Sequence, residues 1–307
     1  MTCALVLASQ SLAAADHFSL GTATAGGGFP VFGAALAQAV HEVDPSIEIQ
    51  PRDTAGSFEN VRLLASGDID LGLVQGEVAE QAFACVDPSA RKLRIVAAMY
   101  TSPGMFVVRA DSPYQQIRDL VGKPVAFGTR GSGLVLLARN ILAGLNLDPD
   151  RDFRAVYLER AADGPTLLQD GRIAALWGAG LGWPSFVAIS QQPAGARFIA
   201  PDAAECARIV TREGSLRKLT VPADTYAGQI TPIETVGSWS FVLAREDWPE
   251  ELAYRLARAL DQAQPALGNS MAAARETTLA NTVAAAPSVD RIHPGVLRYL
   301  RETGRVK

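Results

Sequence analysis

Residues 18–43 read FSLGTATAGGGFPVFGAALAQAVHEV and join a short strand, a glycine-rich loop and a helix. Phe18 and Leu20 precede the loop, and apolar side chains then recur over 31–43 at helical spacing. Open α/β sheets built from such units bind ligands at the carboxyl ends of their strands. This stretch therefore predicts an α/β protein with a glycine loop at a ligand-facing edge.

The next elements continue the same pattern. Residues 47–50 alternate like a strand, and Ser57 stands where an N-cap belongs, ahead of a helix over 58–66. Gly67 is placed to end that helix in the left-handed conformation. Residues 69–74 then predict a buried strand, because they are almost continuously apolar.

The second half of the chain repeats this order. A strand over 124–127 precedes the loop 128–133, which reads GTRGSG, and a helix follows over 134–145. Gly171 follows a second short helix at the place that Gly67 holds in the first half. Two readings are open, a chance similarity of α/β units or two lobes of one topology, and we favour the second.

The lobes are expected to connect through two crossovers. Residues 101–104 read TSPG between two strands, and Gly237-Ser238 interrupts a later strand, so we place hinges at both points. The first lobe would comprise residues 16–104 and 238–307, and the second lobe residues 105–237. Each would be a mostly parallel sheet flanked by helices, with the ligand cleft between them.

Composition narrows the class of protein. The chain has 307 residues, 48% of them hydrophobic and 20% charged, which is enough for two packed domains and excludes a disordered chain. Twenty-eight basic and 32 acidic residues give a net charge of −4, which argues against a nucleic-acid partner. Three His and three Cys argue against a zinc-finger or disulfide scaffold.

The N-terminus resembles the second half of a secretory signal peptide. Residues 4–8 are apolar, and residues 11–15 read SLAAA, with small side chains at cleavage spacing. We therefore expect residues 1–15 to be a signal-peptide remnant and the protein to be exported to the periplasm. The uncharged stretch 173–196 contains several Gly and Pro residues, so it predicts a strand and a loop and not a membrane span.

The common nucleotide-binding and catalytic sequence motifs are incomplete or absent in this sequence. The first loop has the Walker spacing, but Gly27-Gly28 replaces its Lys-Ser/Thr pair, and Arg130 stands where a dinucleotide loop needs its second glycine. Neither a Gly-x-Ser-x-Gly elbow nor a His-Glu-x-x-His helix occurs in the sequence. We expect no catalytic residue, no metal and no cofactor.

Anion binding explains the two glycine loops better than an enzymatic function does. Both glycine loops end at a helix start, where free N–H groups and the helix dipole attract negative charge. Arg130 and Arg52 could add a cation, although each could equally be a solvated loop charge. The candidate ligand-binding residues are Thr24, Ala25, Gly26, Gly27, Gly28, Phe29, Gly56, Ser57, Asn60, Gln75, Glu77, Tyr100, Thr129, Arg130, Gly131, Ser132, Gly133, Trp177, Gly178 and Trp183.

In this order the loops resemble the TAXI-type solute receptors of tripartite ATP-independent periplasmic (TRAP) transporters. The matching stretches are LGTATAGGGFPVFGAALA, TAGSFENVRLLASGDIDLGLVQGE, DLVGKPVAFGTRGSG and RIHPGVLRYLRETG. The resemblance implies a two-lobed periplasmic-binding fold of type II that closes on a small carboxylate and delivers it to a permease driven by an ion gradient. The chain departs from the family at Phe29-Pro30, where an aromatic pair is common, and at Gly76, where a Ser is common.

The expected function is therefore that of a TRAP receptor for a small anionic organic solute, of the carboxylate, amino acid or 2-oxo acid type. We expect it to act as a monomer with TRAP-type permease subunits as partners. One alternative is a periplasmic receptor for an ATP-driven importer. The other is a non-transport sensor or an enzyme on the same fold.

Overall fold

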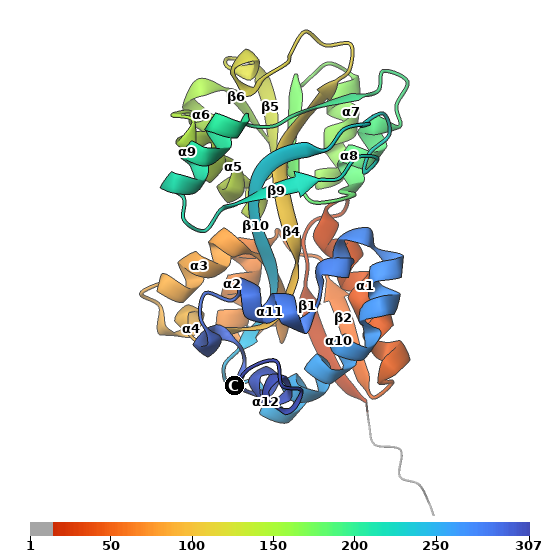
Figure 1. Ribbon diagram of the computed structural model, residues 1–307, viewed down its shortest axis with the longest axis vertical. Coiled ribbons are helices and arrows are strands. Elements are labelled where there is room, and N and C mark those ends of the chain that lie inside the picture. Colours follow the sequence, from red (N-terminus) through yellow and green to blue (C-terminus); the bar gives the residue numbers. More distant parts are fainter. Residues whose placement is uncertain (1–14) are drawn as a thin grey trace, which may run out of the picture.

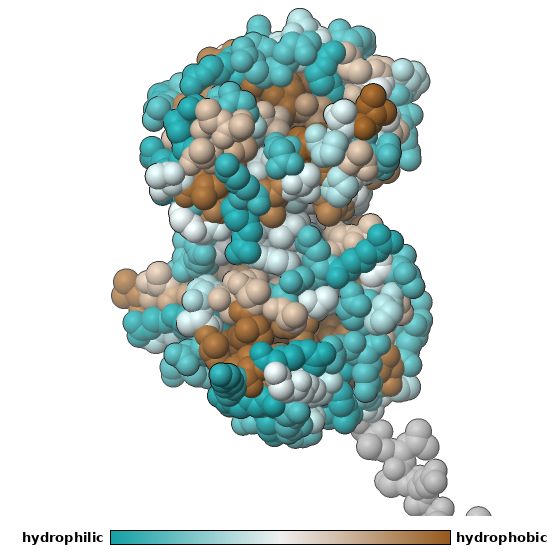
Figure 2. Space-filling model, in the orientation of Figure 1, coloured by the Kyte–Doolittle hydropathy of each residue, from teal (hydrophilic) through white to brown (hydrophobic). Residues whose placement is uncertain are grey.

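The computed structural model describes residues 15–307. Figure 1 shows two α/β bodies, one above the other, joined by the long strands β4 and β10 that run through both. The space-filling view in Figure 2 shows the same two bodies separated by a narrow waist. Apart from Ala15, the predicted signal-peptide remnant lies outside the described residues. The two-lobed α/β architecture predicted from the sequence is confirmed.

One path of paired strands crosses both lobes, in the order β2-β1-β3-β10-β4-β7-β5-β6, with β8 on β4 and β9 on β10. Pairing is parallel for β1 with β2 and β3, and for β5 with β6 and β7, whereas β4 and β10 pair antiparallel with their neighbours. The strands are β1 (Asp16–Gly21), β2 (Ile47–Arg52), β3 (Leu71–Gln75), β4 (Leu93–Arg109), β5 (Pro124–Thr129), β6 (Arg154–Leu158), β7 (Ala175–Ala179), β8 (Ala196–Ile199), β9 (Arg217–Val221) and β10 (Ile233–Arg245).

Helices flank the sheet in both lobes (Figure 1). They are α1 (Gly28–Val43), α2 (Ser57–Ser66), α3 (Gly76–Ala84), α4 (Pro88–Arg91), α5 (Gly133–Gly144), α6 (Pro149–Asp152), α7 (Gly164–Gln169), α8 (Pro184–Ser190), α9 (Ala203–Arg212), α10 (Glu250–Ser270), α11 (Leu279–Ala285) and α12 (Pro294–Glu302). Within residues 15–307, no helix combines the length and the apolar composition that a bilayer crossing requires.

The interruptions predicted in the two crossover strands are wrong. β4 runs unbroken through residues 101–104, and β10 runs unbroken through Gly237. The reason is that these two segments pair with each other, Gly237 opposite Pro103 and Ser238 opposite Ser102. A Cβ on Gly237 would lie 2.0 Å from the carbonyl oxygen of Ser102, so this glycine permits a close backbone approach inside a strand.

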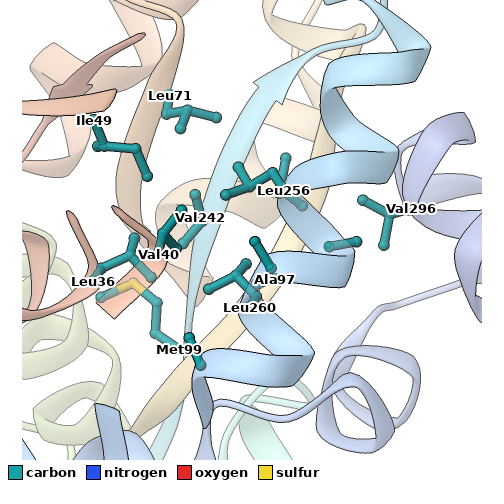
Figure 3. Packing of buried hydrophobic residues seen from close by; sticks show 14 of the residues in the cluster. Leu36, Val40, Ile49, Leu71, Ala97, Met99, Val242, Leu256, Leu260 and Val296 are labelled. Atoms are coloured by element: carbon teal, nitrogen blue, oxygen red, sulfur yellow. The ribbon is translucent and has the colours of Figure 1, made fainter. Parts of the chain in front are cut away.

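Separate apolar clusters fill the two bodies. In the first, α1, α10 and α12 cover strands β1, β3, β4 and β10, and Figure 3 shows Leu36, Val40, Val242 and Leu256 meeting between these layers. In the second, Trp177 and neighbouring apolar residues pack under α5 and α9. Each body therefore has a core of its own, as is typical of separate domains.

Two predicted helix ends are confirmed, whereas two helices begin earlier than the sequence predicts. Gly67 and Gly171 both have positive φ, 80° and 69°, at the ends of α2 and α7, as predicted. α1 begins at Gly28, inside the glycine loop and three residues before the predicted start. α2 begins at Ser57 with Gly56 as its N-cap, so the predicted capping role of Ser57 is wrong.

A candidate ligand cleft between the lobes

A cavity of about 50 Å³ lies between the carboxyl ends of strands from the two lobes. All of its lining side chains are uncharged. Most of the candidate ligand-binding residues meet here, together with several that the sequence did not single out. The lining residues are Ala23, Thr24, Gly27, Gly28, Phe29, Gly56, Ser57, Gln75, Tyr100, Ser102, Gly128, Thr129, Ser132, Gly133, Leu134, Leu158, Ala161, Ala179 and Trp183.

The first wall is the start of α1. Gly27 is the N-cap, so the N–H groups of Gly28 and Phe29 have no acceptor within the helix. A Cβ on Gly28 would lie 3.1 Å from the hydroxyl oxygen of Tyr100 and 3.5 Å from the ring of Trp183. Glycine at this position keeps the helix start close to both aromatic side chains.

The starts of α2 and α5 face each other across the cleft. The N–H of Phe58, in the first turn of α2, donates to the carbonyl of Gly131, just before α5, at 3.3 Å. A Cβ on Gly133 would lie 2.9 Å from the Oγ of Ser57. Each helix start carries about half a positive charge, so the two like ends repel unless an anion lies near them.

Three hydroxyl groups around the cavity already accept a hydrogen bond and keep their own proton to donate. Ser57 Oγ accepts from the N–H of Gln75 at 3.0 Å, and Ser132 Oγ accepts from the N–H of Leu134 at 3.1 Å. Thr24 Oγ1 accepts from the N–H of Ala161 at 3.3 Å. Each hydroxyl oxygen therefore has one of its two lone pairs engaged, and its proton is available to a bound acceptor.

Tyr100 supplies a further donor. Its side chain is 4% exposed, and burial raises the pKa of its phenol far above the usual value, so the group stays protonated. Within residues 15–307, no hydrogen-bond partner meets its hydroxyl. A buried phenol without a partner that lines a cavity is suited to donate to a bound ligand.

Gln75 connects the cavity to the crossover strands. Its Nε2 donates to Ser238 Oγ at 3.0 Å, and its Oε1 accepts from Ser240 Oγ at 3.4 Å. Ser240 Oγ also lies 3.4 Å from Ser102 Oγ. Both strands therefore fix the orientation of the one amide side chain in the lining.

The lobes are in direct contact at the cleft edge. The N–H of Ala162 in the second lobe donates to the carbonyl of Ala25 in the first, at 3.1 Å. Gly26 has a φ of 85°, and a Cβ on it would lie 2.5 Å from the nitrogen of Ala162. Ala25 and Gly26 therefore form an inter-lobe contact at the edge of the cavity and do not line it. The structure is a closed conformation.

Several candidate residues support the loops without lining the cavity. The Asn60 amide donates to the carbonyls of Gly21, Thr22 and Leu73 and so holds the first loop. Trp177 is fully buried in the core of the second lobe, where its indole N–H donates to Leu134. The remaining members of this group pack against the other lobe or a lining ring: Gly131 lies against Ala55, and Gly178 against the ring of Trp183.

Arg130 and Arg52 lie outside the cavity. The guanidinium of Arg130 lies 4.0 Å from the ring centroid of Tyr157, on the outer side of the second loop. Arg52 is exposed at the end of β2. In this conformation neither arginine contributes a cation to the lining.

Glu77 is a buried carboxylate behind Gln75. Neither of its side-chain oxygens has a clear hydrogen-bond partner within the described chain. Burial raises its pKa to about 7, although its own backbone N–H and the side chains of Ser238 and Gln75 act in the opposite direction. Its carboxyl is 3% exposed and does not line the cavity.

Sequence reasoning missed one group of lining residues. Ser102 was assigned only to a hinge, although it lies in the crossover strand beside the cleft. Leu158 ends a predicted strand, so the rule that ligands bind at carboxyl ends of strands could have identified it and the following Ala161. The other residues that were missed are Ala23, Gly128, Leu134 and Ala179.

The side chains that line the cleft are of few chemical types. The lining contains no His, Cys or acidic side chain that could act as a base, a nucleophile or a metal ligand. Over residues 15–307, no cluster of three or more His, Cys, Asp or Glu side chains is suited to a metal ion. The lining combines uncharged hydrogen-bond donors with apolar side chains.

Comparison with solved structures supports the fold. The chain is similar to the alkanesulfonate-binding protein SsuA of Xanthomonas axonopodis pv. citri bound to MOPS, with 19% identity, a TM-score of 0.53 and coverage of 94% of this chain and 84% of that one. The periplasmic aliphatic sulphonate binding protein SsuA of Escherichia coli matches with 20% identity, a TM-score of 0.51 and coverage of 93% and 83%. The periplasmic binding protein BugD matches with 11% identity, a TM-score of 0.58 and 94% coverage of both chains.

These likenesses show that the fold is that of the periplasmic binding proteins. A family model described as NMT1-like matches residues 20–304, which include both lobes and all the loops of the cleft. The chain therefore belongs to the NMT1-like family.

Proposed function

We propose that the protein is an extracytoplasmic solute receptor that binds a small organic anion in the cleft and delivers it to a membrane permease. The observation that carries this proposal is the convergence of the starts of α1, α2 and α5 on one uncharged cavity. Helix starts bind anions through free N–H groups and the helix dipole. The unpartnered hydroxyl of Tyr100 adds a donor from a separate element.

The donors are sufficient without an arginine. A hydrogen bond to a charged group contributes about 1.5–3 kcal/mol, so four such bonds would contribute roughly 6–12 kcal/mol. A micromolar dissociation constant corresponds to about 8 kcal/mol. Backbone N–H groups at the helix starts, with Ser57, Ser132 and Tyr100, supply at least that number of donors.

Closure would follow from the same electrostatics. The starts of α2 and α5 belong to different lobes, residues 16–104 with 238–307 and residues 105–237, and the closed conformation brings these like partial charges together. An anion between them turns repulsion into attraction, so ligand would favour closure about the strands near Gly104 and Gly237. Small-angle scattering should show compaction on ligand addition. An unchanged radius of gyration with bound ligand would contradict this mechanism.

Two permease classes are open. The resemblance of the loops to TAXI-type receptors supports a TRAP-type permease driven by an ion gradient. A substrate binding protein of an amino acid ABC transporter shares the fold, with a TM-score of 0.51 and 15% identity, so an ATP-driven importer is the second candidate. If a TRAP-type permease is the partner, ligand uptake into vesicles that contain that permease and the purified protein should require an ion gradient and no ATP. Dependence on ATP would favour the second candidate.

The first test is a thermal-shift screen of the purified protein over organic acids. A ligand that binds the native state raises the melting temperature. An acid that raises it, and that mass spectrometry recovers unchanged, supports a receptor. Chemical turnover of that acid would instead support the enzyme alternative, and a sensor would bind it without supporting uptake.

A further inference from the structure

The lining of the cleft also indicates which anions it accepts. It contains no Lys, Arg, His, Asp or Glu side chain. The donors come from lobe 1 and from the loop before α5. Lobe 2 contributes the apolar side chains of the lining, here called the apolar wall: Leu134, Leu158, Ala161, Ala179 and Trp183, of which only Trp183 carries a polar group, its indole N–H.

We propose that the cleft selects a short organic acid with a single negative charge and no ammonium group, and that it rejects amino acids and dicarboxylates. This inference rests on the proposed receptor function and narrows it. The shared ligand chemistry is a singly charged oxyanion on a small apolar body, either a carboxylate or a sulfonate.

An ammonium group would have no anionic partner in the lining. Taking a charge out of water costs several kcal/mol unless a counter-charge or good acceptors replace the water. Glu77, two residues beyond the lining residue Gln75, does not line the cavity, and burial raises its pKa to about 7. Glu80, on the next turn of α3, also affects Glu77 but does not line the cavity.

A second carboxylate would also lack a partner. The donors cluster where α1, α2 and α5 begin, so one oxyanion there places the rest of the ligand toward the apolar wall. A second carboxylate beside Leu158 or Ala179 would be buried with at most the indole N–H of Trp183 as a donor, which is unfavourable. Only the uncharged end of a ligand fits this wall.

The volume limits the length of the ligand. A space of about 50 Å³ holds roughly four water molecules, because one water needs about 10–15 Å³. The closed cleft therefore suits a short acid better than a long-chain acid. Propionate and ethanesulfonate are such short acids.

The experiment is a calorimetric titration of the purified full chain with matched pairs of ligands. Propionate and alanine differ by one ammonium group, and butyrate and succinate differ mainly by one carboxylate. We expect the simple acid of each pair to bind at least 30-fold more tightly. Ethanesulfonate is titrated beside propionate to separate the two oxyanion chemistries, and octanoate tests the size limit.

The outcomes separate this inference from the proposed function. Alanine or succinate binding as tightly as its partner, or octanoate binding more tightly than propionate, would overturn the selectivity and leave an anion receptor standing. If no acid bound, both the selectivity and the proposed receptor function would be overturned. A tight-binding amino acid whose affinity falls in Glu77→Gln would show that Glu77 reaches the ligand after all.

One variant tests the same inference from the protein side. Gln75→Glu places a carboxylate in the lining with almost the same shape. We expect the affinity for propionate to fall at least 100-fold, with a melting curve that still shows one cooperative transition. Unchanged affinity in that folded variant would contradict a site that depends on an uncharged lining. Arg130→Gln is the matched control and should bind propionate like the parent.

Discussion

Gly133, at the start of α5, stands directly against Ser57, at the start of α2. A Cβ on Gly133 would lie 2.9 Å from Ser57 Oγ and 2.3 Å from the Cβ of Gln75. Gly133 belongs to one lobe and its two neighbours to the other, so the contact depends on how far the lobes close. This glycine therefore sets the closest approach of two helix starts across the cleft.

Gly133→Ala should weaken ligand binding without unfolding the protein. The added methyl group cannot fit in the closed form because it would meet the Cβ of Gln75, but it has no such neighbour if the lobes separate. We expect the dissociation constant to rise at least tenfold and the melting temperature of the ligand-free protein to change little. Calorimetry and a melting curve measure the two quantities.

The matched control for this substitution is Gly214→Ala. A Cβ on Gly214 would have no neighbour within 4 Å. This variant should bind like the parent. Equal affinity in both alanine variants would remove the α5 start from the binding site.

Tyr100→Phe removes one hydroxyl and keeps the ring that packs against Phe32, at a centroid distance of 5.5 Å. If the hydroxyl donates to the bound anion, its loss costs about 1.5–3 kcal/mol, or roughly 10- to 150-fold in affinity. Titration of the acid found in the screen measures this change. Tyr254→Phe, on the exposed side of α10, is the control, and an equal effect in both variants would contradict a role for Tyr100 in the site.

Local chemistry in the sequence predicted much of this arrangement. Glycine loops followed by apolar helical spacing located α1 and α5, and Gly67 and Gly171 end their helices with positive φ as expected. Such features depend on a few neighbouring residues, so a single sequence contains them. Gln75 was identified for the same reason, because it ends a strand that reads as buried.

Long-range pairing explains the errors. Gly237 looks like a strand break in sequence, yet it allows β10 to approach Ser102 of β4, which is 135 positions earlier in the chain. Arg130 looks like a ligand clamp, yet the ring of Tyr157, brought near by the pairing of β5 with β6, offers its guanidinium a stacking partner. Neither partner can be read from the residues beside Gly237 or Arg130.

Arg130→Gln should leave ligand affinity unchanged, within about twofold. The guanidinium stacks on Tyr157 outside the cavity, so its removal takes no donor from the cleft. Ser132→Ala, two residues further along the loop, should weaken binding about tenfold or more, because Ser132 lines the cavity and its hydroxyl proton is available to donate to a bound anion. Titration of both variants with the same acid compares the two losses of affinity. A larger loss for Arg130→Gln would return the arginine to the binding site.

Glu77 should make the stability of the protein depend on pH. Burial raises its pKa to about 7, from about 4.5 for a glutamate in an unfolded chain, so the folded state holds a proton that the unfolded chain releases between these pH values. Folding stability is therefore greatest below about pH 4.5 as far as this group is concerned, and it falls as the pH rises through 7. The full difference corresponds to about 3 kcal/mol, at 1.36 kcal/mol per pH unit.

Glu77→Gln removes this titration and keeps the shape of the side chain. We expect the variant to unfold at a higher urea concentration than the parent at pH 8 and at nearly the same concentration at pH 4.5. Glu159→Gln, at an exposed position, is the control and should follow the parent at both pH values. If Glu77→Gln and the parent lost stability equally between pH 4.5 and pH 8, Glu77 would have to be charged and stabilised in the folded protein, by a group or a water that reaches its carboxylate from the cleft.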